Sequence, residues 1–197
     1  MKKTEILDAL LLENKGYLKS SDAFQAGISR AYLGDYVRKR GLERAAQGLY
    51  MAPDAWVDDM FVIQSRYPQA VFSHETALYL LNLAEREPTR YAATLRTGAS
   101  SAGLTKCGLK VYKIKHELFE MGIVEAQSHA KHTVRIYNAE RTVCDMLRSR
   151  RNVEIQDLQA AIKGYVRTKE KNIPLLMRYA KLFSVEKAIR QYLEVLL

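Results

Sequence analysis

Residues 20–51 read SSDAFQAGISRAYLGDYVRKRGLERAAQGLYM, and this segment carries the clearest structural pattern in the chain. The pattern predicts a short helix that ends at Gly27 and a longer helix over residues 30–40. Ser29 is placed to cap the start of the longer helix, and Gly41 is placed to end it. The segment therefore indicates two helices joined by a tight turn.

The flanking segments extend this pattern into a small domain. Upstream, apolar residues recur at helical spacing over 4–13, which predicts a first helix. Downstream, strands at 42–45 and 49–51 enclose a turn that contains Gly48, as in a β-hairpin. Two helices joined by a glycine-containing turn are typical of a helix-turn-helix, and a hairpin directly behind them is a wing. The sequence thus predicts an N-terminal winged helix-turn-helix over residues 1–55.

A unit of this kind inserts the N-terminal part of its second helix into the major groove of DNA. Arg30, Gly34 and Arg38 share one face of that helix, at i, i+4 and i+8. Arg44 and Gln47 fall near the hairpin tip, where they suit contacts to phosphate or to the minor groove. The candidate DNA-binding residues are Lys19, Ser20, Ser29, Arg30, Tyr32, Arg38, Lys39, Arg40, Arg44 and Gln47.

Gly34 needs a reason, because a glycine inside a helix costs about 1 kcal/mol relative to alanine. Close approach to a DNA backbone is one reason, and close packing on a neighbouring helix is the other. The alternative to DNA binding is a small structural or protein-docking module in which Arg30, Arg38, Lys39 and Arg40 are merely solvated.

Composition and charge exclude several classes of protein. The chain has 197 residues, 48% of them hydrophobic, and a net charge of +9, which excludes disorder and favours polyanionic partners. We expect a cytoplasmic protein, because no apolar run would span a bilayer, no signal peptide is recognisable, and two cysteines make no disulfide framework. Residues 1–55 carry 9 Lys and Arg against 7 Asp and Glu, so most of the positive charge lies beyond them.

Residues 56–197 are predicted to form a second domain of mixed strands with a helical C-terminal end, so the whole chain is of the α+β class. The expected helices are 56–67, 74–83 and several from 138 onward, and the expected strands are 70–72, 91–96, 109–115, 123–127 and 133–137. A basic surface is expected there, either solvated or facing an acidic protein or DNA. Its candidate residues are Lys110, Lys113, Lys115, Lys131, Arg135 and Arg148.

No pattern indicates a catalytic site, a metal site or a cofactor. His129 and His132 lack further ligands at the spacing of a zinc site, and we expect them to be solvated hairpin residues. His74, at a helix start, suits a hydrogen-bonding role. The glycine-rich residues 97–103 fit no phosphate-binding motif and predict a plain loop. A DNA-tethered metal-dependent nuclease and a ligand-responsive repressor remain the alternative functions.

Four stretches together resemble the AbiEi antitoxins of abortive-infection type IV toxin–antitoxin systems. They are residues 41–50, 72–80, 134–145 and the helical end around residues 179–180 and 192–194. The resemblance implies a winged helix-turn-helix that binds inverted repeats in its own promoter and represses transcription. It also implies a C-terminal domain that counteracts a nucleotidyltransferase-like toxin without a stable complex, in bacterial phage defence. Within the third stretch, Glu140, Arg141, Thr142 and Asp145 resemble a structural motif of the family.

Overall fold

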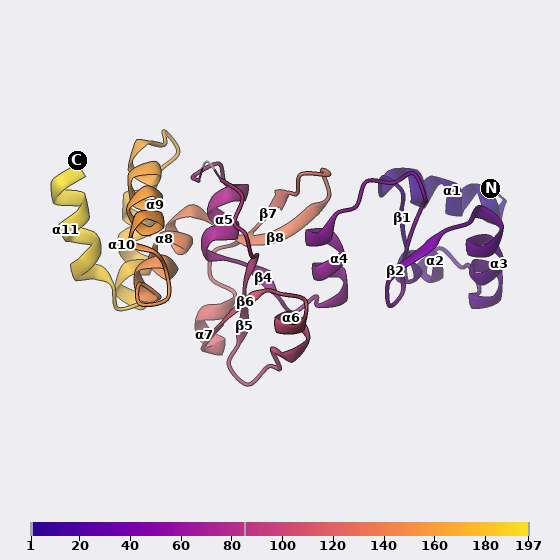
Figure 1. The fold of residues 1–197 in the computed structure, drawn as a ribbon, viewed down its shortest axis with the longest axis horizontal. Helices are drawn as coiled ribbons and strands as arrows, with labels where there is room; N and C mark the ends of the chain where they lie inside the picture. Colours follow the sequence, from indigo (N-terminus) through magenta and orange to yellow (C-terminus); the bar gives the residue numbers. More distant parts are fainter. Residues whose placement is uncertain (1, 85, 197) are drawn as a thin grey trace. The chain divides into compact units, whose positions relative to one another are not determined.

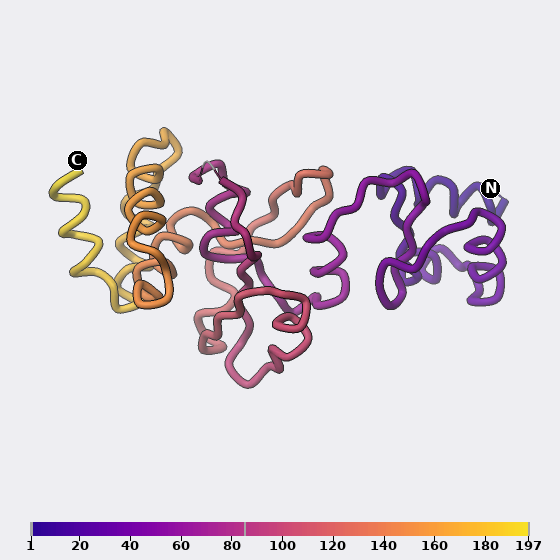
Figure 2. The backbone as a smooth tube through the Cα atoms, viewed as in Figure 1, coloured from indigo at the N-terminus to yellow at the C-terminus, as the bar shows by residue number. Residues whose placement is uncertain are grey.

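A computed structural model describes residues 2–84 and 86–196. The chain divides into two units, whose elements are labelled in Figure 1. The first unit takes in the chain up to Pro68 together with Gln127–Thr133. The second unit takes in Gln69–Ala126 and the chain from Val134 onward. The backbone therefore passes from one unit to the other three times, as can be followed in Figure 2.

The first unit contains three helices, a small sheet and a fourth helix. Its elements are α1 (Lys3–Glu13), β1 (Tyr17–Lys19), α2 (Ser20–Gln25), α3 (Arg30–Arg40), β2 (Glu43–Ala46), β3 (Leu49–Met51) and α4 (Asp59–Arg66). The sheet is antiparallel with the order β1-β3-β2. Leu7, Leu18, Ala23, Leu33 and Tyr36 belong to the buried cluster that joins the first three helices. The expected order of three helices and a hairpin is therefore present.

The ends of α3 lie where the sequence places them. The Ser29 Oγ accepts a hydrogen bond from the Tyr32 amide at 3.3 Å, which satisfies one of the free N–H groups of the first turn. Gly41 follows the helix with φ +64°, the left-handed conformation that favours glycine. Both signals are local, and for this reason the bounds of α3 are predictable.

The second unit is built on a five-stranded sheet and followed by helices. Its elements are β4 (Val71–Phe72), α5 (His74–Leu80), β5 (Ala92–Arg96), α6 (Ala102–Lys106), β6 (Lys110–Ile114), α7 (His116–Phe119), β7 (Ile123–Gln127), β8 (Thr133–Tyr137), α8 (Ala139–Arg148), α9 (Ile155–Arg167), α10 (Ile173–Leu182) and α11 (Glu186–Leu196). The strand order is β6-β5-β4-β8-β7, with β4 and β8 parallel and β4 and β5 antiparallel. This mixed sheet with a helical end confirms the α+β class.

Helix α8 is buried along most of its length, and Arg141 connects it to the segment around α7. The guanidinium is fully buried; it donates to Asp145 Oδ2 at 2.8 Å and to the carbonyls of Leu118 and Met121 at 2.6 and 2.8 Å. Its centre also lies 4.1 Å from the Tyr137 ring centroid. One side chain thus ties α8 to two backbone carbonyls of the α7 segment. The structural role of this motif is therefore visible in its contacts.

Two expectations from the sequence need correction. The helix expected over 56–67 begins only at Asp59, because the buried Asp58 caps it by accepting from the Phe61 amide at 3.1 Å. The helix expected to reach residue 83 ends at Leu80, and Asn82 has a positive φ of 56°. Within the described ranges, no helix combines the length and apolar character needed to cross a bilayer.

Candidate nucleic-acid interface

Helix α3 turns a basic face away from the core of the first unit. Leu33 and Tyr36 are buried, whereas Arg30, Arg38 and Lys39 are exposed. Gly34 lies on the exposed side, and a Cβ added to it would meet no atom within 4 Å. Packing on a neighbouring helix therefore does not explain this glycine within the unit.

The basic side chains at the C-terminal end of α3 differ in their freedom. Arg40 donates to both carboxylate oxygens of Asp8, on α1, at 2.6 and 2.7 Å. The Tyr36 hydroxyl donates to the same carboxylate at 2.5 Å, and burial together with this hydrogen bond raises the pKa of Tyr36 to about 12. Arg38 pairs with Asp35 at 3.4 Å, and its side chain is 80% exposed. Arg40 thus fixes α3 against α1, while Arg38 is available to a ligand.

The N-terminal end of α3 is also tied to α1. The hydroxyls of Tyr32 and Thr4 lie 2.7 Å apart, which holds the Tyr32 ring beside α1. At the hairpin, the Ser20 amide donates to the Gly48 carbonyl at 2.8 Å and so joins the start of α2 to the turn. Lys19 lies with its ammonium 4.9 Å from the Phe61 ring centroid.

The exposed cations and the hairpin belong to one unit. Arg44 on β2 and Gln47 in the turn are exposed, as are Arg30, Arg38 and Lys39 on α3. Because β2 and β3 follow α3 directly, a duplex held against α3 would meet the hairpin as well. The arrangement suits a polyanion that extends over both elements.

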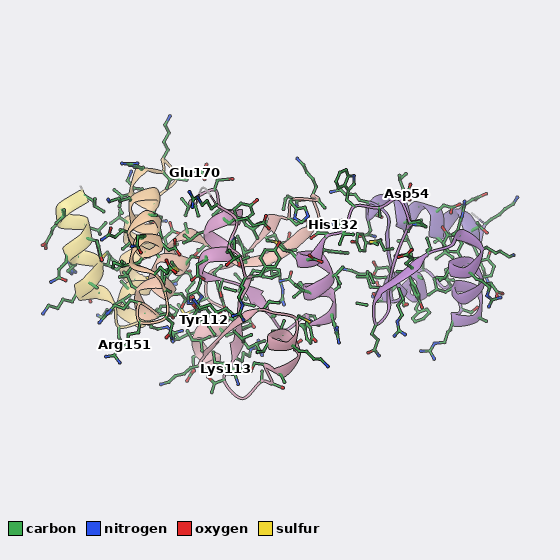
Figure 3. The ribbon with its side chains drawn as sticks, in the orientation of Figure 1. Asp54, Tyr112, Lys113, His132, Arg151 and Glu170 are labelled. Carbon is green, nitrogen blue, oxygen red and sulfur yellow. The ribbon has the colours of Figure 1, made fainter. Side chains whose placement is uncertain are left out.

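The six residues expected to form a second basic surface do not share one environment. Lys131 lies in the first unit and the other five in the second. Lys110 donates to the Asn152 carbonyl at 2.6 Å and to Glu75 at 3.2 Å, so its charge is largely used within the fold. Arg148 lies 3.7 Å from Asp145, and Arg135 donates to the Ala70 carbonyl at 3.4 Å. Lys113, labelled in Figure 3, and Lys115 are exposed.

His132 is not a solvated hairpin residue, as the sequence suggested. This residue, labelled in Figure 3, is only 6% exposed. Its Nδ1 lies 2.7 Å from the Oδ2 of the fully buried Asp58. Its Nε2 lies 3.1 Å from the Asn14 carbonyl, and its ring stacks on Phe61 with 4.4 Å between centroids. Three segments of the first unit therefore meet at one imidazole ring.

The same carboxylate gathers further partners. Ser128 Oγ donates to Asp58 Oδ2 and accepts from the His132 amide at 3.0 Å. The Asp58 amide donates to the Tyr17 hydroxyl at 3.0 Å, and this hydroxyl donates to the Trp56 carbonyl at 3.2 Å. No local sequence signal predicts the cluster, because Asp58 and His132 are 74 positions apart.

His74 has the hydrogen-bonding role expected at the start of α5. Its ring nitrogens lie 2.9 Å from Ser73 Oγ and 3.1 Å from Ser149 Oγ, and the ring stacks on Tyr112 with 3.5 Å between centroids. Burial, reinforced by the charge of Arg148, lowers the pKa of His74 well below its usual range. Among the described residues, no group of three or more His, Cys, Asp or Glu is arranged to hold a metal ion.

Comparison with known families finds a match within the first unit. Residues 5–53 match the model of the AbiEi antitoxin transcriptional regulators. The resemblance expected from the sequence is thereby confirmed over the segment that contains α1 to α3 and the hairpin. The match covers about a quarter of the chain.

Comparison with solved structures extends over nearly the whole chain. The crystal structure of the RV2827C protein from Mycobacterium tuberculosis is similar with a TM-score of 0.56 and 13% sequence identity. The similarity covers 97% of this chain and 79% of the other, and at this identity it concerns the fold alone. A search of curated protein sequences finds no significant match.

Proposed function

We propose that this chain is a DNA-binding regulator that represses its own promoter, with residues 1–55 acting as a winged helix-turn-helix on inverted repeats of double-stranded DNA. The observation that carries the proposal is the exposed basic face of α3, capped by Ser29 and followed directly by the hairpin of β2 and β3. The match to AbiEi regulators over residues 5–53 supports it independently.

Each exposed side chain then has a separate task. Arg30 and Arg38 read base edges, where a guanidinium suits the two acceptors of guanine. Lys39 and Arg44 contact phosphate, which positions the unit without selecting a sequence. Arg40, bound to Asp8 on both carboxylate oxygens, orients α3 against α1.

The test is binding to a duplex that carries the promoter of the chain's own gene. Arg30→Ala should weaken binding by about 1–3 kcal/mol and reduce discrimination, whereas Lys39→Ala should weaken all duplexes alike. Arg178→Ala, which changes an exposed arginine of α10, is the matched control and should change nothing. Unchanged promoter binding by an Arg30→Ala/Arg44→Ala variant in a gel-shift assay would contradict the proposal.

We further propose that residues 56–197 carry the antitoxin activity against a nucleotidyltransferase-like toxin. The support is the resemblance to AbiEi antitoxins, together with a family match described as an antitoxin regulator. The full chain with Arg30→Ala and Arg44→Ala should lose repression and still rescue cells that express the toxin. If this variant lost both promoter binding and the rescue of toxin-expressing cells, the result would contradict a separate antitoxin activity.

A further inference from the structure

An aromatic side chain stands on the surface of the first unit, in the segment between β3 and α4. Trp56 is 84% exposed and its neighbour Val57 is 59% exposed. Trp56 is also the single tryptophan of the sequence. Tryptophan is usually highly buried, so an exposed indole next to an exposed valine marks a surface for a ligand.

Trp56 borders a hollow of about 460 Å³ that lies wholly within the first unit. Volumes of this size are typical of small-ligand sites. We name this hollow the Trp56 shelf; it is lined by Lys15, Trp56, His129, Ala130, Lys131 and His132. None of these described lining residues is acidic, and both lysines are exposed. The shelf therefore attracts an anion.

The backbone under the shelf is held in place. The Tyr17 hydroxyl donates to the Trp56 carbonyl at 3.2 Å, and His129 Nε2 lies 3.3 Å from the Val57 carbonyl. The next residue, Asp58, is fully buried in the cluster with His132. Because three consecutive residues are anchored, the indole is presented from a fixed backbone, which lowers the entropy cost of binding.

The two lysines are brought together by an unusual backbone. Lys15 and Lys131 have φ values of +50° and +67°, which non-glycine residues rarely adopt. Lys15 Nζ donates to the Lys131 carbonyl, so the two residues meet although 116 positions separate them. Strained positions of this kind persist where the surrounding structure holds them, and they cluster at binding sites.

We propose that the Trp56 shelf binds an unpaired nucleotide of single-stranded DNA, with the base stacked on the Trp56 indole and the two phosphates that flank the nucleotide on Lys15 and Lys131. A flat aromatic face beside ammonium groups matches the two parts of a nucleotide, and single-strand binding proteins combine the same elements. A second copy of this chain fits less well, because a two-fold contact at the shelf would bring its lysines face to face. An acidic peptide would satisfy the charges but would leave the indole face without a stacking partner.

The hydrogen-bonding groups of the shelf favour DNA. The carbonyls of Trp56, Val57 and Lys131 already accept hydrogen bonds from Tyr17, His129 and Lys15. Each of these carbonyls already has a hydrogen-bond partner, so none of the three is left unsatisfied for a ribose 2′-hydroxyl to satisfy. The proposal does not depend on duplex binding by α3.

The first measurement uses the fluorescence of Trp56 in the full chain. Titration with a short oligothymidylate should quench this fluorescence in a saturable manner, because the base stacks directly on the only indole. The logarithm of the affinity should fall with the logarithm of the salt concentration with a slope of about −1.4, as expected for two phosphate contacts on a single strand. Absence of quenching would overturn the proposal.

Variants are compared by the anisotropy of a labelled oligothymidylate. Trp56→Ala should weaken binding about five- to hundredfold, and Trp56→Phe should retain part of it. Lys15→Asn and Lys131→Asn should each reduce the salt slope by about 0.7, and asparagine tolerates the positive φ of both positions. Leu12→Ala, at a residue of the same unit that is 81% exposed, is the matched control and should leave binding unchanged.

Two comparisons separate this site from its alternatives. The Arg30→Ala/Arg44→Ala variant should lose promoter binding and keep oligothymidylate binding, so either proposal can fail alone. Neither an aspartate-rich peptide nor an oligouridylate should bind more tightly than oligothymidylate. Binding of either one more than tenfold tighter than DNA, or an equal loss with Leu12→Ala and Trp56→Ala, would overturn the assignment.

Discussion

Asp58 and His132 are the residues whose contacts most change the interpretation of this chain. The carboxylate accepts from Ser128 and from the Phe61 amide, and it faces the imidazole of His132 at 2.7 Å. Removing one partner of a buried hydrogen bond is costlier than replacing both, because the remaining polar group stays buried without a partner. The pair therefore makes the stability of the first unit depend on a residue more than seventy positions away.

We expect His132→Phe to lower the free energy of unfolding by about 1–3 kcal/mol. The ring still stacks on Phe61, but the buried Asp58 loses its imidazole partner. Adding Asp58→Asn should recover part of the loss, since asparagine is neutral and still caps α4. Urea unfolding followed by circular dichroism measures both, and a double variant no more stable than the single one would contradict the pairing.

His74 predicts a dependence of stability on pH. Burial holds its folded-state pKa well below its usual value, so the native ring stays neutral where the unfolded chain binds a proton. Stability should therefore fall as the pH decreases below about 6.5, by up to about 1.4 kcal/mol per pH unit. In His74→Asn, chosen because asparagine tolerates the φ of +51° at this position, this slope should be missing between pH 5 and 6.5. Equal slopes in unfolding curves of both proteins would refute the assignment.

Helix α3 shows which parts of the structure a sequence can predict. Ser29 and Gly41 act on their own helix, so its bounds follow from neighbouring residues. The start of α4 is different: the sequence predicted a helix from Trp56, but the buried Asp58 caps the helix, which begins at Asp59. The solvated interpretation of His132 failed for the same reason, because its partners Asn14 and Asp58 are distant in sequence.

A substitution at Gly34 is expected to change protein stability and promoter binding in opposite directions. Gly34→Ala should stabilise the protein by about 1 kcal/mol, because alanine favours helices and the new methyl meets no atom within 4 Å. The same methyl should weaken promoter binding by about 1–3 kcal/mol, since it lies on the face proposed to approach DNA. Thermal unfolding measures the change in stability, and the anisotropy of a labelled promoter duplex measures the change in binding, both on the same preparation. A variant that is more stable and binds equally well would remove Gly34 from the interface.

At the scale of the whole molecule, the sequence predicted a set of exposed cations on one short segment; Arg30, Arg38, Lys39 and Arg44 are exposed, and their contact with DNA stays a prediction. The second basic surface was less so: Lys110 is taken up by Glu75 and Asn152, and Lys131 belongs to the first unit. The charge pattern of a sequence does not reveal which cationic side chains donate hydrogen bonds to carbonyls of the same chain. For this reason the six cations expected beyond residue 55 do not form one common basic surface.

The division of the chain predicts the behaviour of a fragment. Residues 1–68 alone lack Ser128 and His132, so Asp58 loses two of its partners and Phe61 loses its stacked ring. We expect faster hydrogen exchange at the amides of Asp58 and Phe61 than in the full chain. Joining residues 127–133 to this fragment through a flexible linker should restore protection. Equal exchange in the fragment and the full chain would show that the hairpin tip does not support this unit.

The threefold passage of the backbone has a consequence for recombination. A chimera that exchanges the N-terminal module at a single junction near residue 68 would import a new module and retain residues 127–133 of the old one. The imported counterparts of Asn14 and Asp58 would then face a foreign imidazole and serine. If the first unit binds the operator as proposed, grafting a new operator specificity onto this chain should therefore require two crossover regions. Residues 127–133 would be transferred together with residues 1–68.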